Sequence, residues 1–155
     1  MVIGSYSVSV DNKGRFFVPA KWRDTYGDVQ LIAMRGITEN PNDHFLLIMP
    51  LPYYSRLRGE IDAQSPANIR LGDAARSVSQ YAFECDMDSK GRILIDKRLL
   101  DYAGFGSLAT LADTRSNCFE VWEPASLDAK NESYTLLDSA RDLQRLADER
   151  ESAQK

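Results

Sequence analysis

The chain has few of the features that mark secreted, membrane or metal-binding proteins. Only two of its 155 residues are cysteine, Cys85 and Cys118, and neither lies in a Cys-x-x-Cys or Cys/His cluster. This spacing argues against a disulfide framework and against a zinc site. No apolar run approaches the length of a membrane span, and residues 1–9 lack the basic and apolar segments of a secretory signal. We therefore expect a cytoplasmic protein with no membrane partner.

The sequence also lacks the motifs of the common enzyme classes. It contains no Gly-rich phosphate loop, nucleophile elbow or zinc motif. The single histidine, His44, lies in a Pro- and Asn-rich loop without a Ser or Cys partner nearby in sequence. Cys85 and Cys118 fall inside apolar strand patterns, which is typical of core cysteines. We therefore predict that the protein is not an enzyme and uses no cofactor, bound metal or small-molecule substrate.

Positive charge is not in excess. The chain has 19 Lys and Arg residues against 23 Asp and Glu residues, a net charge of −4. This balance argues against a protein that coats nucleic acid by bulk electrostatics, but it permits one that presents a few arginines locally. With 43% hydrophobic and 27% charged residues, the composition is that of a folded domain.

An internal repeat is the main feature that the sequence does contain. Residues 10–18 (VDNKGRFFV) and 87–95 (MDSKGRILI) share Asp, Lys, Gly and Arg, and their other positions are mostly apolar in both copies. Further matches at the same spacing of 77 residues are Trp22 with Leu99, Asp24 with Asp101, Gly27 with Gly104, Leu31 with Leu108 and Met34 with Leu111. Residues 45–50 match residues 119–124 at a spacing of 74, because a loop is shorter in the second copy. The chain is therefore two tandem copies of one module.

Each copy predicts the order strand, turn, strand, short helix, strand, loop, strand. Residues 5–10 alternate between apolar residues and serine, as a half-buried strand does. Gly14 suits a tight turn, Pro19 suits the first turn of a helix, and Gly27 ends that helix. Two further strands are predicted at residues 30–34 and 45–49.

The segments outside the repeats are predicted to be helical. Pro52 and Ser65-Pro66 mark two helix starts in the linker, and residues 133–155 carry an apolar stripe on a charged helix. The predicted division is a first module at residues 1–51, a helical linker at 52–81, a second module at 82–127 and a C-terminal helical tail at 128–155.

The repeated turn is the strongest functional signal. It comprises Asp11, Lys13, Gly14 and Arg15 in the first copy and Asp88, Lys90, Gly91 and Arg92 in the second. The Asp and Arg of each turn can pair, which has two interpretations. The pair closes the hairpin, or the Asp aims an exposed Arg at phosphates or guanine edges. We favour the second interpretation, because closing a hairpin requires glycine but not a repeated Lys-Gly-Arg.

Other charged residues give weaker signals. Arg23 and Arg98, with Lys21 and Lys97, lie on the short helices near the turns and are secondary candidates for DNA contact. Most helix arginines are simply solvated. The acidic residues Glu84, Asp86 and Asp88 alternate along one strand and so share a face, which raises the possibility of a metal site. The first copy has serines at two of these places, so a solvated strand face is the preferred interpretation.

The Asp-x-Lys-Gly-Arg motif, followed by an apolar triplet, Pro19 and a helix carrying Arg23, resembles the AbrB-type swapped-hairpin family of DNA-binding modules. Two copies in one chain resemble the MraZ family in particular, from about Tyr6 to Leu127. The second copy departs from this pattern in two places. Asp96 replaces the usual proline, and we expect it to cap the second helix. The loop at residues 112–115 also lacks the family's usual glycine turn.

This resemblance implies a fold and a function. The implied fold is α+β and mainly β: two tandem swapped-hairpin modules closed into one pseudo-twofold β-barrel, with linker helices and a C-terminal helix. The implied function is sequence-specific repression of the division and cell-wall gene cluster, including the protein's own promoter. The implied partners are double-stranded promoter DNA with direct repeats and further copies of the chain in a ring-like oligomer at the nucleoid. The DNA contact of the family maps onto Arg15 and Arg92.

A protein-binding module of the antitoxin type is the alternative function. AbrB-like hairpins also occur in antitoxins, and the helix predicted at residues 133–155 offers a surface for a partner. The duplication argues against this alternative, because such antitoxins resemble one module followed by a tail.

Overall fold

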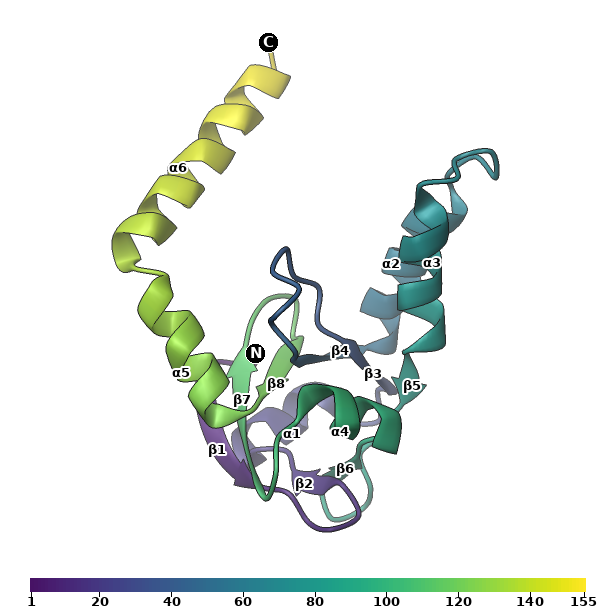
Figure 1. The fold of residues 1–155 in the computed structure, drawn as a ribbon, viewed down its shortest axis with the longest axis vertical. Helices are drawn as coiled ribbons and strands as arrows, with labels where there is room; N and C mark the ends of the chain where they lie inside the picture. Colours follow the sequence, from purple (N-terminus) through teal and green to yellow (C-terminus); the bar gives the residue numbers. More distant parts are fainter. The chain divides into compact units, whose positions relative to one another are not determined.

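The computed structural model describes residues 1–155, in which Met1–Pro124 and Ala125–Lys155 form two compact units (Figure 1). The chain is a mixed α/β protein whose strands are antiparallel. The elements in chain order are β1 (Ser5–Ser9), β2 (Arg15–Phe17), α1 (Ala20–Tyr26), β3 (Leu31–Arg35), β4 (Leu46–Pro50), α2 (Leu51–Asp62), α3 (Leu71–Gln80), β5 (Phe83–Glu84), β6 (Arg92–Leu94), α4 (Lys97–Ala103), β7 (Leu108–Asp113), β8 (Phe119–Trp122), α5 (Pro124–Ser133) and α6 (Leu136–Ala153).

The strands form an open sheet and a separate ribbon. Six strands pair in the order β1-β7-β8-β4-β3-β5, and β2 pairs only with β6. The prediction of a single closed barrel is therefore wrong. The barrel stays open because β1 and β5 are the two edges of the large sheet, while the three-residue strands β2 and β6 hydrogen-bond to each other and to neither edge.

Strands of the two repeats pair with each other about a pseudo-twofold axis. In the β2–β6 ribbon Phe16 faces Ile93, its own counterpart in the other repeat. The edge strand β1 of the first repeat pairs with β7 of the second, and β5 of the second pairs with β3 of the first. Each repeat therefore relies on the other for the partners of its first two strands.

The main core contains equivalent residues from both repeats. The buried pairs of counterparts are Phe16 and Ile93, Val18 and Ile95, Trp22 and Leu99, and Tyr26 and Ala103. The prediction that Trp22 and Tyr26 face the core is confirmed, since they are 1% and 2% exposed. The Tyr6 ring meets the Trp22 ring edge to face, with centroids 5.2 Å apart. The two repeats thus enclose one shared core.

The predicted alignment of the last two strands is wrong by one residue. The strand pairing makes Ala109, rather than Leu108, the counterpart of Leu31, and it makes Leu111 the counterpart of Ala33. The same shift makes Leu46 equivalent to Phe119. A shift of one residue exchanges the two faces of a strand. The corrected counterparts are all fully buried, whereas Leu108 is 53% exposed.

The repeat helices end as predicted, at Gly27 and Gly104. The predicted cap on α4 is also confirmed, because the Asp96 side chain accepts a hydrogen bond from the backbone N–H of Arg98 at 2.9 Å. In the linker, α2 and α3 form a helical hairpin (Figure 1). The second of these helices begins at Leu71 and not at Pro66, because residues 65–70 form turns, one of them held by the Ser65 hydroxyl accepting from the Ala67 N–H.

The turn between β7 and β8 uses two non-glycine residues with positive φ, Ser116 at 57° and Asn117 at 59°. The buried Tyr26 hydroxyl donates to the Asn117 carbonyl oxygen at 2.9 Å and holds this turn. A left-handed Asn is tolerated because its short polar side chain can bond locally. Ser116 and Asn117 therefore make this turn in the second repeat, which has no glycine there.

The second unit consists of the rest of α5 and of α6. The N-terminus of α6 has a capping box, in which Thr135 and Asp138 satisfy each other's backbone N–H groups. None of the helices in the chain has the length and hydropathy that crossing a bilayer requires.

Candidate nucleic-acid interface

The turn of the first repeat holds Arg15 in a defined direction. One Asp11 carboxylate oxygen accepts from the backbone N–H groups of Lys13 and Arg15, at 3.0 and 2.9 Å, and the other accepts from Arg15 Nε at 2.7 Å. The backbone bond from Arg15, more than any other contact, holds the pKa of Asp11 below its usual value. Arg15 is therefore fixed at Nε, while its two terminal Nη nitrogens make no hydrogen bond within the chain.

The second repeat builds the same turn. Asp88 accepts from the backbone N–H groups of Lys90 and Arg92, each at 2.9 Å, and from Arg92 Nε at 2.9 Å. The backbone bond from Arg92 is again the largest cause of a lowered pKa, here that of Asp88. The two arginine side chains are 32% and 23% exposed, and the lysines are exposed. The structure thus contains two copies of one arginine-presenting turn.

Backbone bonds between the repeats set the two turns side by side on the ribbon. The Val18 N–H donates to the Gly91 carbonyl oxygen at 2.9 Å, and the equivalent bond joins the Ile95 N–H to Gly14 at 3.0 Å. Both turns and the β2–β6 ribbon lie together at the lower end of the first unit in Figure 1. The sequence predicted two separate motifs, and the fold combines them into one surface.

The outer face of the β2–β6 ribbon is the centre of this surface. Because side chains alternate along a strand, buried Phe16 and Ile93 leave their neighbours pointing outward. The outward residues are Arg15, Phe17, Arg92 and Leu94. Phe17 and Leu94 were not among the predicted site residues, although the period-two alternation around Phe16 and Ile93 is a signal that identifies them.

Each turn glycine lies under a side chain of the other repeat. Gly14 and Gly91 have φ of 86° and 85°, in the region that favours glycine. A Cβ on Gly14 would lie 2.4 Å from Leu100 Cδ1, and a Cβ on Gly91 would lie 2.5 Å from Arg23 Nε. Arg23 and Leu100 are counterparts in the two repeats, so the same packing position is basic in one and apolar in the other.

We expect Gly14→Ala to destabilise the protein by at least ~1–2 kcal/mol, the cost of placing a side chain in left-handed backbone, before the overlap with Leu100 is counted. Gly59→Ala is the matched control, because Gly59 lies inside α2 with nothing within 4 Å of its added Cβ. That change should stabilise the helix by ~0.5–1 kcal/mol. Urea unfolding of both variants measures the difference, and equal stabilities would contradict the assigned turn conformation.

The secondary candidates on the short helices have different surroundings. Arg23 donates from Nε to the Val18 carbonyl oxygen at 2.8 Å, and its guanidinium lies 5.7 Å from the centroid of the Phe17 ring. Arg98 is held by Asp96 through two hydrogen bonds, at 3.0 and 3.2 Å, and lies over the Phe83 ring. Arg23 thus adjoins both the ribbon and the second turn, whereas Arg98 is engaged by its own helix cap. Their contact with DNA stays a prediction.

The alternating acidic residues do not form a metal-binding group. Asp86 accepts a hydrogen bond from the Leu31 N–H at 3.0 Å, and Asp88 holds its turn. The prediction that the cysteines belong to the core is confirmed, because Cys85 and Cys118 are 3% and 1% exposed. Burial raises the pKa of both thiols, that of Cys118 to about 11, so both are protonated at neutral pH.

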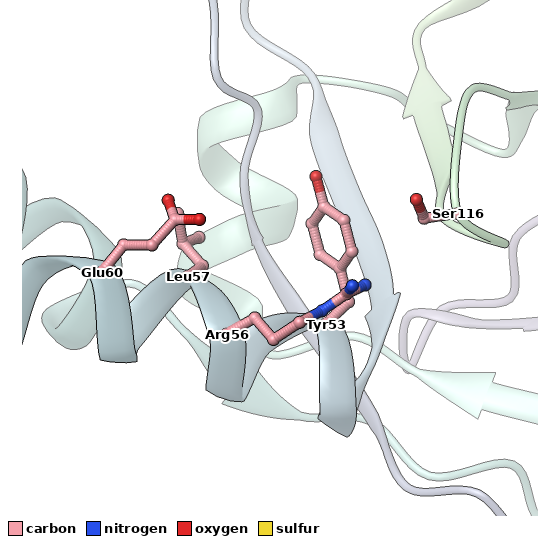
Figure 2. A pocket seen from close by; sticks show the side chains of 5 residues that line it. All are labelled: Tyr53, Arg56, Leu57, Glu60 and Ser116. Carbon is pink, nitrogen blue, oxygen red and sulfur yellow. The ribbon is translucent and has the colours of Figure 1, made fainter.

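A pocket of about 200 Å³ lies beside α2 and is lined by Tyr53, Arg56, Leu57, Glu60 and Ser116 (Figure 2). The Arg56 guanidinium lies 5.4 Å from the centroid of the Tyr53 ring. Figure 2 shows the Glu60 carboxylate and the Ser116 hydroxyl at opposite ends of the pocket. The pocket therefore lacks the paired nucleophile and base of covalent catalysis.

The fold and the surface define a class of duplicated α/β chains. Their two-stranded ribbon presents two arginines, each oriented by a hydrogen bond to an aspartate. A family model described as "MraZ protein, putative antitoxin-like" matches residues 80–149. The transcriptional regulator MraZ of Halothermothrix orenii is 30% identical over 144 residues, which is 90% of this chain and 96% of that protein. The transcriptional regulator MraZ of Saccharophagus degradans is 33% identical over 125 residues, which is 79% of this chain and 82% of that protein. This chain belongs to the MraZ family.

A solved structure, that of PHS018 from Pyrococcus horikoshii, aligns with a TM-score of 0.31 and 16% identity over 78% of this chain and 88% of that chain. A TM-score this low does not indicate a shared fold.

Proposed function

We propose that this protein is a transcriptional regulator that binds double-stranded DNA through the β2–β6 ribbon and its two turns. The relatives from Halothermothrix orenii and Saccharophagus degradans are named transcriptional regulators, which supports this role. The observation that carries the proposal is the duplicated turn, in which an Asp fixes the arginine at Nε and leaves both Nη groups without a partner.

The chemistry of this surface suits DNA. The planar fork of a guanidinium can bind O6 and N7 of guanine, or two oxygens of a phosphate, at the same time. Lys13 and Lys90 are exposed beside the arginines and are suited to contact phosphates. The major groove of B-DNA admits a two-stranded β-ribbon, and the β2–β6 ribbon is such an element.

The pseudo-twofold arrangement supports the AbrB-type swapped-hairpin assignment, because the first two strands of each repeat pair with strands of the other. We further propose that several chains assemble into a homo-oligomer that binds direct repeats in its own promoter, within the division and cell-wall cluster, and represses it at the nucleoid. Repeated contacts in an oligomer would compensate for the few basic residues that one acidic chain presents.

The test is a titration of labelled DNA from upstream of the protein's own gene, with shuffled DNA of equal length and composition as control. The upstream DNA should bind more tightly, and its affinity should fall with salt, with a log–log slope of about −0.9 for each phosphate contact. Light scattering of the protein without DNA should give a mass well above the 17.5 kDa of one chain. Equal binding of both DNAs would contradict sequence-specific recognition.

A further inference from the structure

Two large apolar side chains lie exposed in the middle of the basic ribbon face. Phe17 is 50% exposed and Leu94 is 53% exposed, although their strand neighbours Phe16 and Ile93 are almost completely buried. The two positions are counterparts, so both repeats place an apolar residue at the same point. An apolar residue repeated at the centre of a charged surface indicates an apolar contact with whatever the surface binds.

Each of these residues faces an arginine across the ribbon. The register pairs Arg15 with Leu94 and Phe17 with Arg92. Directly opposed side chains have Cβ atoms about 4.5–5.5 Å apart, so each apolar residue and its arginine form one unit of the surface. The pseudo-twofold axis through the Phe16–Ile93 pair exchanges these two units.

Both apolar residues have positively charged neighbours. The guanidinium of Arg23 lies 5.7 Å from the centroid of the Phe17 ring. Leu94 borders an open hollow of about 400 Å³ whose charged lining residues are Lys13, Lys97, Glu84 and Asp96. Arg23 and Arg92 therefore adjoin Phe17, and Arg15 and Lys13 adjoin Leu94. Of the two carboxylates at the hollow, that of Asp96 is already paired with Arg98. Such surroundings favour, as the binding partner, a polyanion that carries an apolar group rather than an apolar protein surface.

We propose that Phe17 and Leu94 contact the methyl groups of thymine while Arg15 and Arg92 bind neighbouring guanines or phosphates. The thymine C5-methyl is the apolar feature among the hydrogen-bonding edges of the major groove, and apolar side chains are its usual contacts. Residues two apart on a strand are separated by about 6.8 Å, close to two base-pair steps. Each ribbon strand therefore reads alternate base pairs, one with an arginine and one with an apolar residue.

This proposal rests on the proposed DNA binding and is tested with the same upstream DNA. One sample is amplified with dTTP and another with dUTP and uracil-containing primers, which removes every thymine methyl without changing the base-pairing sequence. The parent protein should bind the uracil DNA about fourfold more weakly for each thymine methyl that the ribbon covers. The variant carrying both Phe17→Ala and Leu94→Ala should bind the two DNAs equally. The single variant Leu94→Ala should discriminate between them less than the parent does.

The matched control carries Val29→Ala and Ile69→Ala, which truncate two apolar side chains that are 41% and 89% exposed and lie outside the ribbon. It should discriminate between the DNAs as the parent does. Thermal melts of all variants check that the fold is retained.

The outcomes separate this proposal from the proposed function. If the parent binds neither DNA, the DNA-binding function is wrong. If the parent binds both equally, or if the double variant still discriminates as the parent does, the methyl contact is wrong and DNA binding stands. A double variant that light scattering finds reduced to a smaller assembly would show that Phe17 and Leu94 contact a second copy of the chain, which also overturns the methyl contact.

Discussion

Arg15→Ala should weaken binding to the upstream DNA by ~1–3 kcal/mol for each base edge that Arg15 recognises, and by more in an oligomer, because every subunit carries the change. The fold should be almost unaffected, since Arg15 is partly exposed and the hairpin is closed by backbone bonds and by Asp11 accepting from the Lys13 N–H. The measurement is a DNA titration at two salt concentrations, with thermal melts alongside. A shallower salt dependence than that of the parent would indicate that Arg15 also binds a phosphate.

Two further variants make this test specific. Arg15→Lys keeps the charge but not the planar fork, so it should still bind a phosphate but no longer recognise a base edge. Arg76→Ala is the matched control, because Arg76 pairs with Asp73 in an exposed ion pair away from the ribbon, and its removal should not affect DNA binding. If Arg15→Ala melts and binds like the parent, the motif only closes the hairpin, and the protein-binding alternative becomes the better one.

Arg92→Ala should weaken binding as much as Arg15→Ala does. Although Asp96 departs from the family pattern, the hydrogen bonds of the two turns match within 0.2 Å, and Asp96 caps its helix without disturbing the turn. A clearly smaller effect of Arg92→Ala would show that the DNA uses the two repeats unequally.

Separating the two repeats should abolish cooperative folding. We expect fragments 1–65 and 66–155, each purified alone, to show no sharp thermal transition, because the cut removes the sole strand partners of β1 and β2 and divides the shared core. Burial of such a core is the main term that offsets chain entropy, and neither half encloses it alone. Circular dichroism melts and calorimetry of each fragment measure whether it unfolds cooperatively.

Mixing the two fragments in equal amounts is the control. The mixture should recover a cooperative transition, since all strand pairs can then form between the fragments. Two separate sharp transitions from the isolated fragments would contradict the single shared fold.

The local features of this protein follow directly from its residues. The Asp–Gly–Arg turns, the half-buried alternation of β1 and the glycine-ended helices follow from residue types at short range, and the structure has all of them. Such features depend on backbone conformation and on hydrogen bonds spanning at most four residues, so a short stretch of sequence specifies them. The duplication was equally visible, because it needs only a comparison of the chain with itself.

The strand alignment, the open sheet and the composite surface depend instead on contacts between distant parts of the chain. Leu31 to Met34 and Leu46 to Met49 are apolar at every position, because one face packs on the main core and the other on a second cluster with α2 and α3. A strand buried on both faces carries no alternation, so its sequence cannot reveal a shift of one residue. Likewise, the meeting of Arg15 with Leu94 and of Arg92 with Phe17 depends on pairing between strands that lie far apart in the chain, which local preferences do not encode.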